Sequence, residues 1–355
     1  MDNTRRAVIL IPSLEPDDRL IAYADRLLEG GFRHIVIVDD GSSEKYQPIF
    51  SAIDAKEGCT VLHHSVNRGK GCALKTGYAF IKENYPDAAG IITADADGQH
   101  TVEDCIRLSE KLMEGKDAMY LGSRDFDLPD IPPKSRFGNK TTSMVFKLLY
   151  GCYLPDTQTG LRAFPMQEID FMMEVEGDRF EYEMNVLIAS RMKKLEMIPV
   201  TITTVYENEN AGTHFHPIRD SWRIYKVIFA GFFRYMGASL LSFLLDQGLA
   251  WLMSDLLGLP IAAGNVGARI VSGGFNFALN RSFVFKSKAG LGKSGLRYLI
   301  VWAVVLLLST VGIQGLCSLF NAPALRWLFK LICDTVLYFL SYQMQRNWVF
   351  AEEKK

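Results

Sequence analysis

Four long apolar stretches in the last third of the chain constrain its fold more than any other feature. They span residues 235–253, 261–279, 298–320 and 325–342. A helix needs about 20 mostly apolar residues to cross a bilayer, and each stretch is close to that length. The second is rich in glycine and contains Arg269 and Asn276, which indicates a face packed against neighbouring helices. The sequence therefore predicts an all-α bundle of four transmembrane helices.

Basic residues around these stretches predict their orientation. Lysine and arginine precede the first stretch, lie between the second and third, and follow the fourth (Arg219, Arg223, Lys226, Arg234; Arg281, Lys286, Lys288, Lys293, Arg297; Arg346, Lys354, Lys355). The other two connections contain only Arg326. Because positively charged loops stay on the cytoplasmic side, both termini and everything before the first stretch are predicted to be cytosolic.

The membrane region also contains an internal repeat. "FRYMGASLL…FNFALNRSFVF" and "LRYLIVWAV…LSYQMQRNWVF" share an Arg-Tyr entry and an Arg-x-x-Val-Phe exit. The sequence therefore predicts two parallel helical hairpins over residues 234–350. Residues 217–233 combine arginines with Trp222 and Tyr225, a mixture typical of a helix that lies in the membrane interface.

The first 200 residues alternate between strand-like and helix-like segments. "AVILI", "HIVIVDDGS", "CTVLHH", "AGIITADADGQ" and "DAMYLGSR" are predicted strands, and the segments between them have helical periodicity. Such alternation predicts a mostly parallel sheet with helices on both faces, an α/β domain over residues 1–216. Ligands on these sheets bind at the carboxyl ends of strands.

Two carboxylates close the fourth predicted strand. Asp95 and Asp97 are two residues apart, and like charges so close repel each other unless a cation lies between them. Mg²⁺ or Mn²⁺ would satisfy this because both prefer oxygen ligands. A polar turn is the alternative interpretation, but Asp39-Asp40 and Arg124-Asp125 are predicted at the same sheet edge, which favours a metal site.

Composition excludes some classes of protein. The chain has 355 residues, enough for about two domains, and its net charge of −1 does not indicate a nucleic-acid partner. No two of the six cysteines form a Cys-x-x-Cys pair, so we expect reduced, structural thiols and no zinc site. The apolar run near the N-terminus is too short for a signal peptide.

The ordered motifs resemble a known enzyme family. "LIPSLEP", "VIVDDGS", "NRGKGCALKTG" and "TADADGQH" resemble family 2 glycosyltransferases of the Rossmann-like GT-A fold. "LGSRDF", "KSRFGNK" and "DTQTGLRAFP" are similar to motifs of the polyprenyl-phosphate and dolichol-phosphate sugar transferases within that family, and the likeness covers residues 5–220. The last third resembles the GtrA-like four-helix membrane family.

The resemblance implies a donor site. Asp97 and Gln99 would be ligands of Mg²⁺ or Mn²⁺, and Asp95 would support both the metal and the ribose. The implied nucleotide-sugar contacts are Pro12, Glu15, Asp39, Asp40, Lys70, Asp95 and His214. The first loop reads P-S-L-E-P where relatives have P-x-Y-N-E, and the region of Thr213 and His214 lacks the lysine of the family's phosphate loop.

The acceptor side follows from the chemistry of a phosphate. A phosphate monoester has a second pKa of about 6, so it needs cationic guidance and no general base at neutral pH. By resemblance, Arg124, Lys134, Ser135 and Arg136 bind this phosphate, with Asp97, Arg124 and Arg136 in catalytic roles. Asp156, Thr159 and Arg162 either shape the sugar pocket or form a structural turn.

The sequence thus predicts an inverting transferase that moves a hexose from a UDP- or GDP-sugar to undecaprenyl or dolichyl phosphate at the inner leaflet. One alternative is a flippase or scaffold for lipid-linked sugars whose soluble domain only binds nucleotide. Another is transfer to a glycan or lipid hydroxyl, with Glu181 or Glu183 as base. A homo-oligomer is left open.

Overall fold

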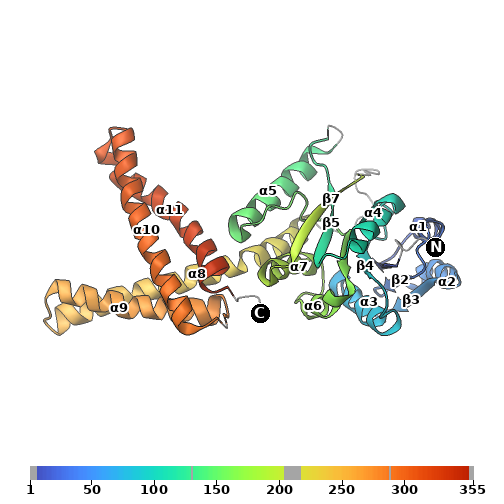
Figure 1. Cartoon of the computed structure of the whole chain (residues 1–355), viewed down its shortest axis with the longest axis horizontal. Helices are drawn as coiled ribbons and strands as arrows, with labels where there is room; N and C mark the ends of the chain where they lie inside the picture. The colour runs from blue at the N-terminus through green and yellow to red at the C-terminus, as the bar shows by residue number, and fades with distance from the viewer. Residues whose placement is uncertain (1–5, 129–130, 204–216, 288, 352–355) are drawn as a thin grey trace. The chain divides into compact units, whose positions relative to one another are not determined.

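The structure is a computed structural model that describes residues 6–128, 131–203, 217–287 and 289–351. It divides into two compact units (Figure 1). The N-terminal unit comprises residues 1–147 and 152–227, and the C-terminal unit comprises residues 148–151 and 228–355. All six cysteines are free thiols.

The N-terminal unit is built on a seven-stranded sheet with the order β3-β2-β1-β4-β6-β5-β7 in the described part of the chain. The strands are β1 (Val8–Ser13), β2 (Ile35–Asp39), β3 (Cys59–His63), β4 (Gly90–Thr93), β5 (Ala118–Arg124), β6 (Arg162–Pro165) and β7 (Glu196–Ile202). Only β6 is antiparallel to its neighbours, β4 and β5. The predicted mostly parallel sheet is confirmed, and the prediction missed β6 and β7.

Helices cover both faces of this sheet (Figure 1). They are α1 (Arg19–Glu29), α2 (Gln47–Asp54), α3 (Lys70–Asn84), α4 (Val102–Met113), α5 (Pro133–Tyr150), α6 (Ile169–Glu174) and α7 (Glu181–Lys193). Ile9 and Ile11 of β1 pack in one core with α1, α2 and α4. Leu10 points to the other face, where its side chain closely approaches Gly77 of α3. This alternation is the period-2 pattern of a strand buried on both sides.

Loops at the carboxyl ends of β2 and β3 pack tightly through one glycine. Gly41 has φ +79°, and a Cβ atom there would lie 2.3 Å from the carbonyl carbon of Val66. Only a residue without a side chain fits this approach and this backbone conformation at once. The glycine therefore holds together two loops that border the predicted nucleotide site.

We expect Gly41→Ala to destabilise the full chain by about 3 kcal/mol or more, because left-handed strain adds to a clash with backbone atoms. Gly115 is the matched control: its φ is +73°, but a Cβ atom there meets nothing within 4 Å. Gly115→Ala should cost only about 1 kcal/mol, the strain alone. Thermal unfolding in detergent measures both, and equal shifts in the midpoint would contradict the packing argument.

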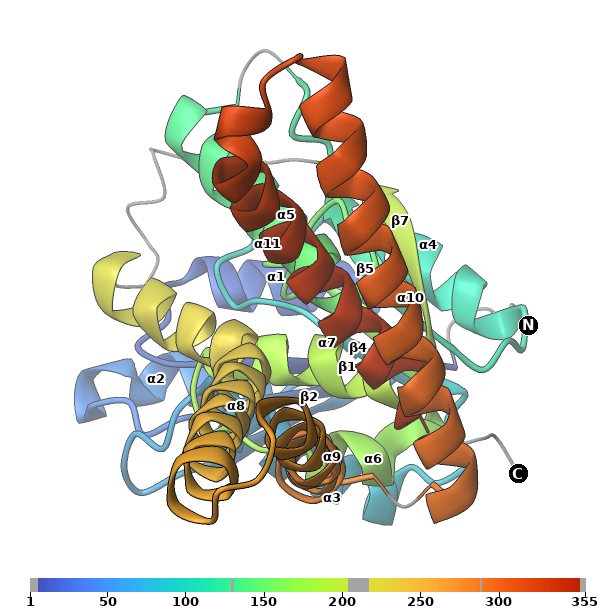
Figure 2. The same cartoon turned by 90° about the vertical axis from the view of Figure 1, so that its left-hand side faces the viewer.

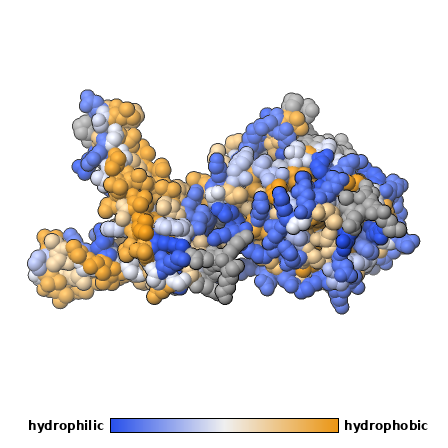
Figure 3. Space-filling model, viewed as in Figure 1, coloured by the Kyte–Doolittle hydropathy of each residue, from blue (hydrophilic) through white to orange (hydrophobic). Residues whose placement is uncertain are grey.

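The only secondary structure in the described residues of the C-terminal unit is helical. Its long helices are α8 (Pro217–Trp251, which begins in the N-terminal unit), α9 (Ile261–Leu279), α10 (Leu291–Leu319) and α11 (Arg326–Met344). α10 and α11 run side by side (Figures 1 and 2). Figure 3 shows apolar residues over most of the visible surface of these helices. Two helices, Ser221–Leu256 and Leu291–Leu319, are long and apolar enough to cross a membrane.

The structure has one continuous helix across residues 233 and 234, where the sequence predicts that an interfacial segment gives way to the first span; that boundary itself stays a prediction. α8 continues without interruption through residues 233 and 234. No proline or capping residue stands there, and the neighbouring Gly231 and Gly237 are tolerated inside a helix. A single helix therefore carries both the aromatic, arginine-containing segment and the first apolar stretch.

Hydrogen bonds at equivalent positions join the two repeats to each other. Short π-helical turns, η6 (Asn280–Val284) and η8 (Gln345–Val349), follow α9 and α11. The first residues of these turns meet each other, because Asn280 Nδ2 donates to Gln345 Oε1 at 3.2 Å. The entry tyrosine of each repeat contacts the exit helix of the other: Tyr235 lies 3.1 Å from Ser341, and Tyr298 donates to Asn276 at 2.8 Å.

Deeper in each hairpin, a second pair of polar contacts occupies equivalent positions. The ion pair between Asp246 of α8 and Arg269 of α9 (3.3 Å) corresponds to the hydrogen bond from Ser309 of α10 to Asp334 of α11 (2.7 Å). Polar side chains on helices in an apolar environment need partners of this kind. Equivalent polar contacts therefore join the two helices of each hairpin.

Candidate active site

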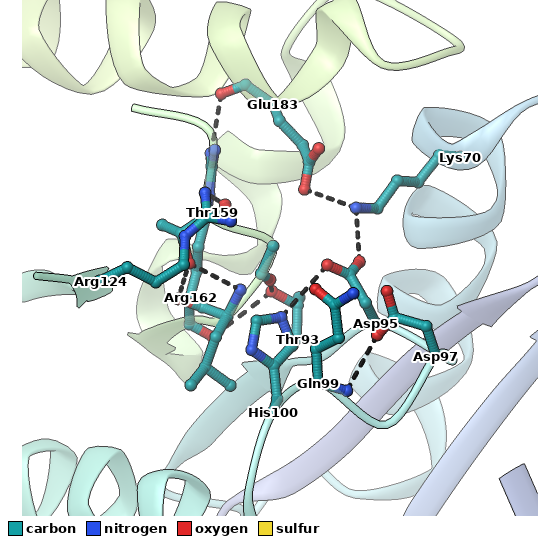
Figure 4. A network of polar contacts seen from close by, with 12 residues as sticks. Lys70, Thr93, Asp95, Asp97, Gln99, His100, Arg124, Thr159, Arg162 and Glu183 are labelled. Carbon is teal, nitrogen blue, oxygen red and sulfur yellow. Dashed lines mark hydrogen bonds and ion pairs between the residues drawn. The ribbon is translucent and has the colours of Figure 1, made fainter. Parts of the chain in front are cut away.

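A connected set of charged side chains lies at the carboxyl end of β4 (Figure 4). Lys70 Nζ contacts Asp95 Oδ1 at 2.6 Å and Glu183 Oε1 at 2.9 Å. Asp95 Oδ2 lies 3.2 Å from His100 Nε2. Lys70 begins α3 and Glu183 lies in the first turn of α7, so one lysine joins three elements around the predicted donor site.

These contacts set the charges of the site. Burial alone would raise the pKa of Asp95, but the charge of Lys70 and a hydrogen bond from His100 hold this pKa well below its usual value. Burial opposes the charge of Lys70 as well, yet Asp95 and Glu183 raise its pKa above the ordinary lysine value. Lys70 is therefore a fixed cation, and Asp95 is a fixed anion.

Asp97 is in a different electrostatic situation. Burial and the negative charge of Asp95 raise its pKa, although the backbone N–H of Gln99 donates to Asp97 Oδ1 at 3.0 Å. The carboxylates of Asp95 and Asp97 lie next to each other, with the Gln99 side chain beside them (Figure 4). An added divalent cation would relieve this repulsion.

The donor atoms present fit Mg²⁺ or Mn²⁺. Carboxylate and amide oxygens are hard ligands, the kind that both ions prefer. Within the described residues, no three His, Cys, Asp or Glu side chains converge on one metal position. Two carboxylates can still suffice, because Mg²⁺ usually takes only one or two protein carboxylates.

The predicted acceptor arginine is held by a buried carboxylate. Arg124, at the end of β5, donates from Nε to Asp156 Oδ2 at 2.7 Å and from Nη2 to Asp156 Oδ1 at 3.2 Å. The guanidinium also lies over the Phe126 ring, 5.1 Å from its centroid. The side chain of Asp156 is fully buried, whereas that of Arg124 is 25% exposed. The pair thus orients a cation that still reaches the surface.

Ser135 and Arg136 occupy the first turn of α5, and Arg136 donates from Nη2 to the Leu128 carbonyl at 2.6 Å. Both side chains are half-buried. The N-terminal end of a helix favours an anion, because its backbone N–H groups and dipole point outward there. The side chain of Lys134 lies outside the described part of the structure.

Asp39 and Asp40, two predicted nucleotide contacts, are both buried. Asp39 accepts hydrogen bonds from the Ser42 backbone at 2.8 Å and from the Gln47 amide at 3.1 Å. Asp40 accepts from the backbone N–H groups just before α3, at 2.9 and 2.7 Å. Both carboxylates therefore organise the loops of the site, and their contact with a nucleotide stays a prediction.

The structure describes two of the three remaining predicted donor contacts. Pro12 is buried in β1, and Glu15 is exposed with φ +48°. The Glu15 N–H donates to Ser42 Oγ at 2.8 Å, which ties the first loop to the loop after β2. His214 lies outside the described residues, as do Thr213 and His216.

The structure shows the surroundings of two motifs whose roles the sequence left open. Asp156, Thr159 and Arg162 are all buried, which favours the structural turn over direct contact with a sugar. Glu181 accepts the backbone N–H groups of Asp178 and Arg179 at 3.3 and 3.2 Å, at the start of α7. The pairing of Lys70 with Glu183 was not predicted, and no spacing in the sequence indicates it.

Comparisons with known proteins agree with this geometry. Residues 9–162 match the family described as Glycosyl transferase family 2, and residues 226–350 match the family described as GtrA/DPMS, transmembrane domain. An uncharacterised protein of Methanocaldococcus jannaschii is 34% identical over 209 residues, which cover 58% of this chain and 83% of that protein.

Two further relatives have names that state an activity. The UDP-N-acetylglucosamine–dolichyl-phosphate N-acetylglucosaminyltransferase of Methanococcus voltae is 27% identical over 216 residues, covering 56% of this chain and 85% of the relative. The dolichol-phosphate mannosyltransferase of Pyrococcus furiosus is 24% identical over 293 residues, covering 78% and 80%. This second alignment extends well beyond the N-terminal unit.

Proposed function

Because the chain belongs to glycosyl transferase family 2 and carries a GtrA/DPMS transmembrane domain, we propose that it transfers a hexose from a nucleotide diphosphate sugar to a polyprenyl phosphate. The acceptor would be undecaprenyl or dolichyl phosphate, and the transfer would invert the anomeric carbon. One observation carries the proposal: paired carboxylates end β4, and an arginine held by a buried aspartate ends β5. Named relatives that act on dolichyl phosphate support it.

The donor half of the site is assigned to the β4 end. Asp97 and Gln99 would hold Mg²⁺ or Mn²⁺ with help from Asp95, and the bound ion would stabilise negative charge on the departing nucleotide diphosphate. Lys70 keeps Asp95 ionised and fixed toward α3. The loops held by Asp39 and Asp40 would form the wall for the nucleotide.

The acceptor half is assigned to the β5 end and the first turn of α5. Arg124, Ser135 and Arg136, with Lys134, would bind the lipid phosphate and direct its oxygen to the anomeric carbon. Such a nucleophile needs no general base at neutral pH. The rival hydroxyl acceptor needs one, but Glu181 caps the backbone before α7 and Glu183 is paired with Lys70. These partners favour the phosphate.

The transmembrane domain makes this a membrane protein with an N-terminal glycosyltransferase domain. We place four spans in residues 234–350, with both termini and the catalytic unit in the cytosol. Exposed apolar side chains outside the spans suit contact with the inner leaflet: Phe137 and Met144 of α5 are 74% and 64% exposed, and Trp222 of α8 is 71% exposed.

A choice between acceptors tests this proposal. The purified full chain receives Mg²⁺ or Mn²⁺, a radiolabelled UDP- or GDP-sugar, and either undecaprenyl phosphate or the unphosphorylated undecaprenol. We expect labelled lipid only with the phosphate, and Glu183→Gln should leave some transfer because no base is required. Labelling of undecaprenol or another hydroxyl lipid, lost in Glu183→Gln, would support the hydroxyl-acceptor alternative instead.

A further inference from the structure

We propose that residues 155–162, which we name the brace loop, position both halves of the site: Asp156 orients Arg124 for the acceptor phosphate, and Gly160 makes room for the Asp95 carboxylate on the donor side. This inference rests on the proposed function. It assigns a role to the two motifs, "KSRFGNK" and "DTQTGLRAFP", beyond the residues that would touch substrate.

Asp156 contacts the acceptor side through Arg124. Its two oxygens accept the Nε and Nη2 hydrogens of Arg124, and Oδ1 also accepts the backbone N–H of Gln158 at 3.0 Å. Because its side chain has no exposed surface, it cannot contact a lipid phosphate itself. A two-point contact to a planar guanidinium fixes direction as well as charge, so Asp156 is a positioning residue.

Helix α5 anchors the same loop. Asn139, which is 1% exposed, donates from Nδ2 to the Pro155 carbonyl at 2.6 Å, and its Oδ1 accepts the Thr157 N–H at 3.4 Å. These two bonds flank Asp156 on both sides. α5 also begins with Ser135 and Arg136. The brace loop thus ties the arginine of β5 to the helix whose first turn would bind the same phosphate.

The far end of the brace loop lies against the donor carboxylate. The Gly160 carbonyl accepts the Thr93 hydroxyl at 2.8 Å, and a Cβ atom on Gly160 would lie 2.3 Å from Asp95 Oδ2 and 2.6 Å from Oδ1. Any side chain there would displace the Asp95 carboxylate from this position. Figure 4 shows Thr93, Asp95 and Arg124 around this segment.

Arg162 closes the loop onto α7. It is 5% exposed and donates to the Thr159 carbonyl at 3.0 Å and to the Glu183 carbonyl at 2.7 Å. Glu183 is the residue whose side chain pairs with Lys70. The two ends of the brace loop therefore serve different substrates, and their substitutions should have different kinetic effects.

A double-mutant cycle on transfer kinetics tests the acceptor end. Asp156→Asn should raise the KM for undecaprenyl phosphate about 10- to 100-fold, because a misdirected guanidinium misplaces the phosphate. The KM for the nucleotide sugar should stay within about twofold. Lysine has no planar guanidinium for Asp156 to orient. In an Arg124→Lys background, Asp156→Asn should therefore change the acceptor KM by less than about threefold.

Glu168→Gln is the matched control, since Glu168 is an equally buried carboxylate paired with Lys193 in the same unit. It should leave both KM values unchanged.

Should Asp156→Asn fail to fold, Asn139→Ala loosens the loop without touching the ion pair, and it should raise the acceptor KM selectively. Gly160→Ala should have the opposite selectivity: it should weaken the use of the nucleotide sugar and leave the acceptor KM constant.

Independent, multiplicative effects of Asp156→Asn and Arg124→Lys would overturn the inference, as would equal effects of Asp156→Asn and the Glu168→Gln control. Loss of donor use in every brace-loop variant would also overturn it, because the two ends would then not be separable. Absence of lipid product with the unmodified protein is a different result: it contradicts the proposed function and, with it, the inference.

Discussion

Asp97→Asn should abolish sugar transfer and at the same time make the metal-free protein more resistant to unfolding. Asparagine removes the negative charge that would hold the metal, and we expect transfer to fall by roughly 10³-fold or more. It also removes the repulsion with Asp95 that raises the pKa of Asp97 in the folded state. The thermal unfolding midpoint without metal should therefore rise by a few degrees.

The gain in stability should depend on pH. A carboxyl whose folded pKa is raised stabilises the fold below its unfolded pKa, and this contribution is lost as pH rises through the folded pKa. The advantage of Asp97→Asn should thus be largest at neutral pH and disappear in acid, where Asp97 is itself protonated. Asp117→Asn, an exposed aspartate before β5, should change neither property. A less stable Asp97→Asn protein would contradict the proposed repulsion.

Lys70→Met should destabilise the protein by about 3–5 kcal/mol, because it leaves Asp95 and Glu183 facing each other without their shared cation. The side chains of Lys70 and Glu183 are only 16% and 15% exposed, so water replaces the lost charge poorly. Adding Glu183→Gln to Lys70→Met should recover a large part of the loss. Chemical unfolding of the full chain in detergent measures the difference.

The control is another lysine of the same helix. Lys82 pairs with Asp170, but both side chains are more than half exposed, so Lys82→Met should cost less than about 1 kcal/mol. Similar losses for Lys70→Met and Lys82→Met would show that the Lys70 pair is screened like a surface pair. No recovery in the Lys70→Met, Glu183→Gln double variant would show that repulsion between Asp95 and Glu183 is not the cause.

Much of the fold could be predicted from periodicity, because most of the strands are apolar runs and the helices between them have one apolar face. β6 could not, since it is four residues long and its antiparallel pairing with β4 and β5 has no local signal. The continuity of α8 was also beyond the sequence argument, which separated its aromatic segment from its apolar stretch.

The candidate site was predictable only where its residues are neighbours in sequence. The spacing of Asp95 and Asp97 left a polar turn as the alternative, and the further charged residues predicted at the same sheet edge favoured a cation site. The partners that orient the site come from far along the chain: Lys70 is 25 residues from Asp95, and Arg124 is 32 residues from Asp156. Only tertiary packing brings these pairs together.

The measurement that tests the central claim most directly is the formation of a sugar phosphodiester on a lipid. The full chain, reconstituted in vesicles with undecaprenyl phosphate and Mg²⁺ or Mn²⁺, is given labelled UDP- and GDP-hexoses one at a time, with Asp97→Asn alongside. The account predicts a labelled lipid that mild acid hydrolyses, formed from one donor and absent with Asp97→Asn. Nucleotide binding without a lipid product from any donor would contradict it and favour a flippase or scaffold.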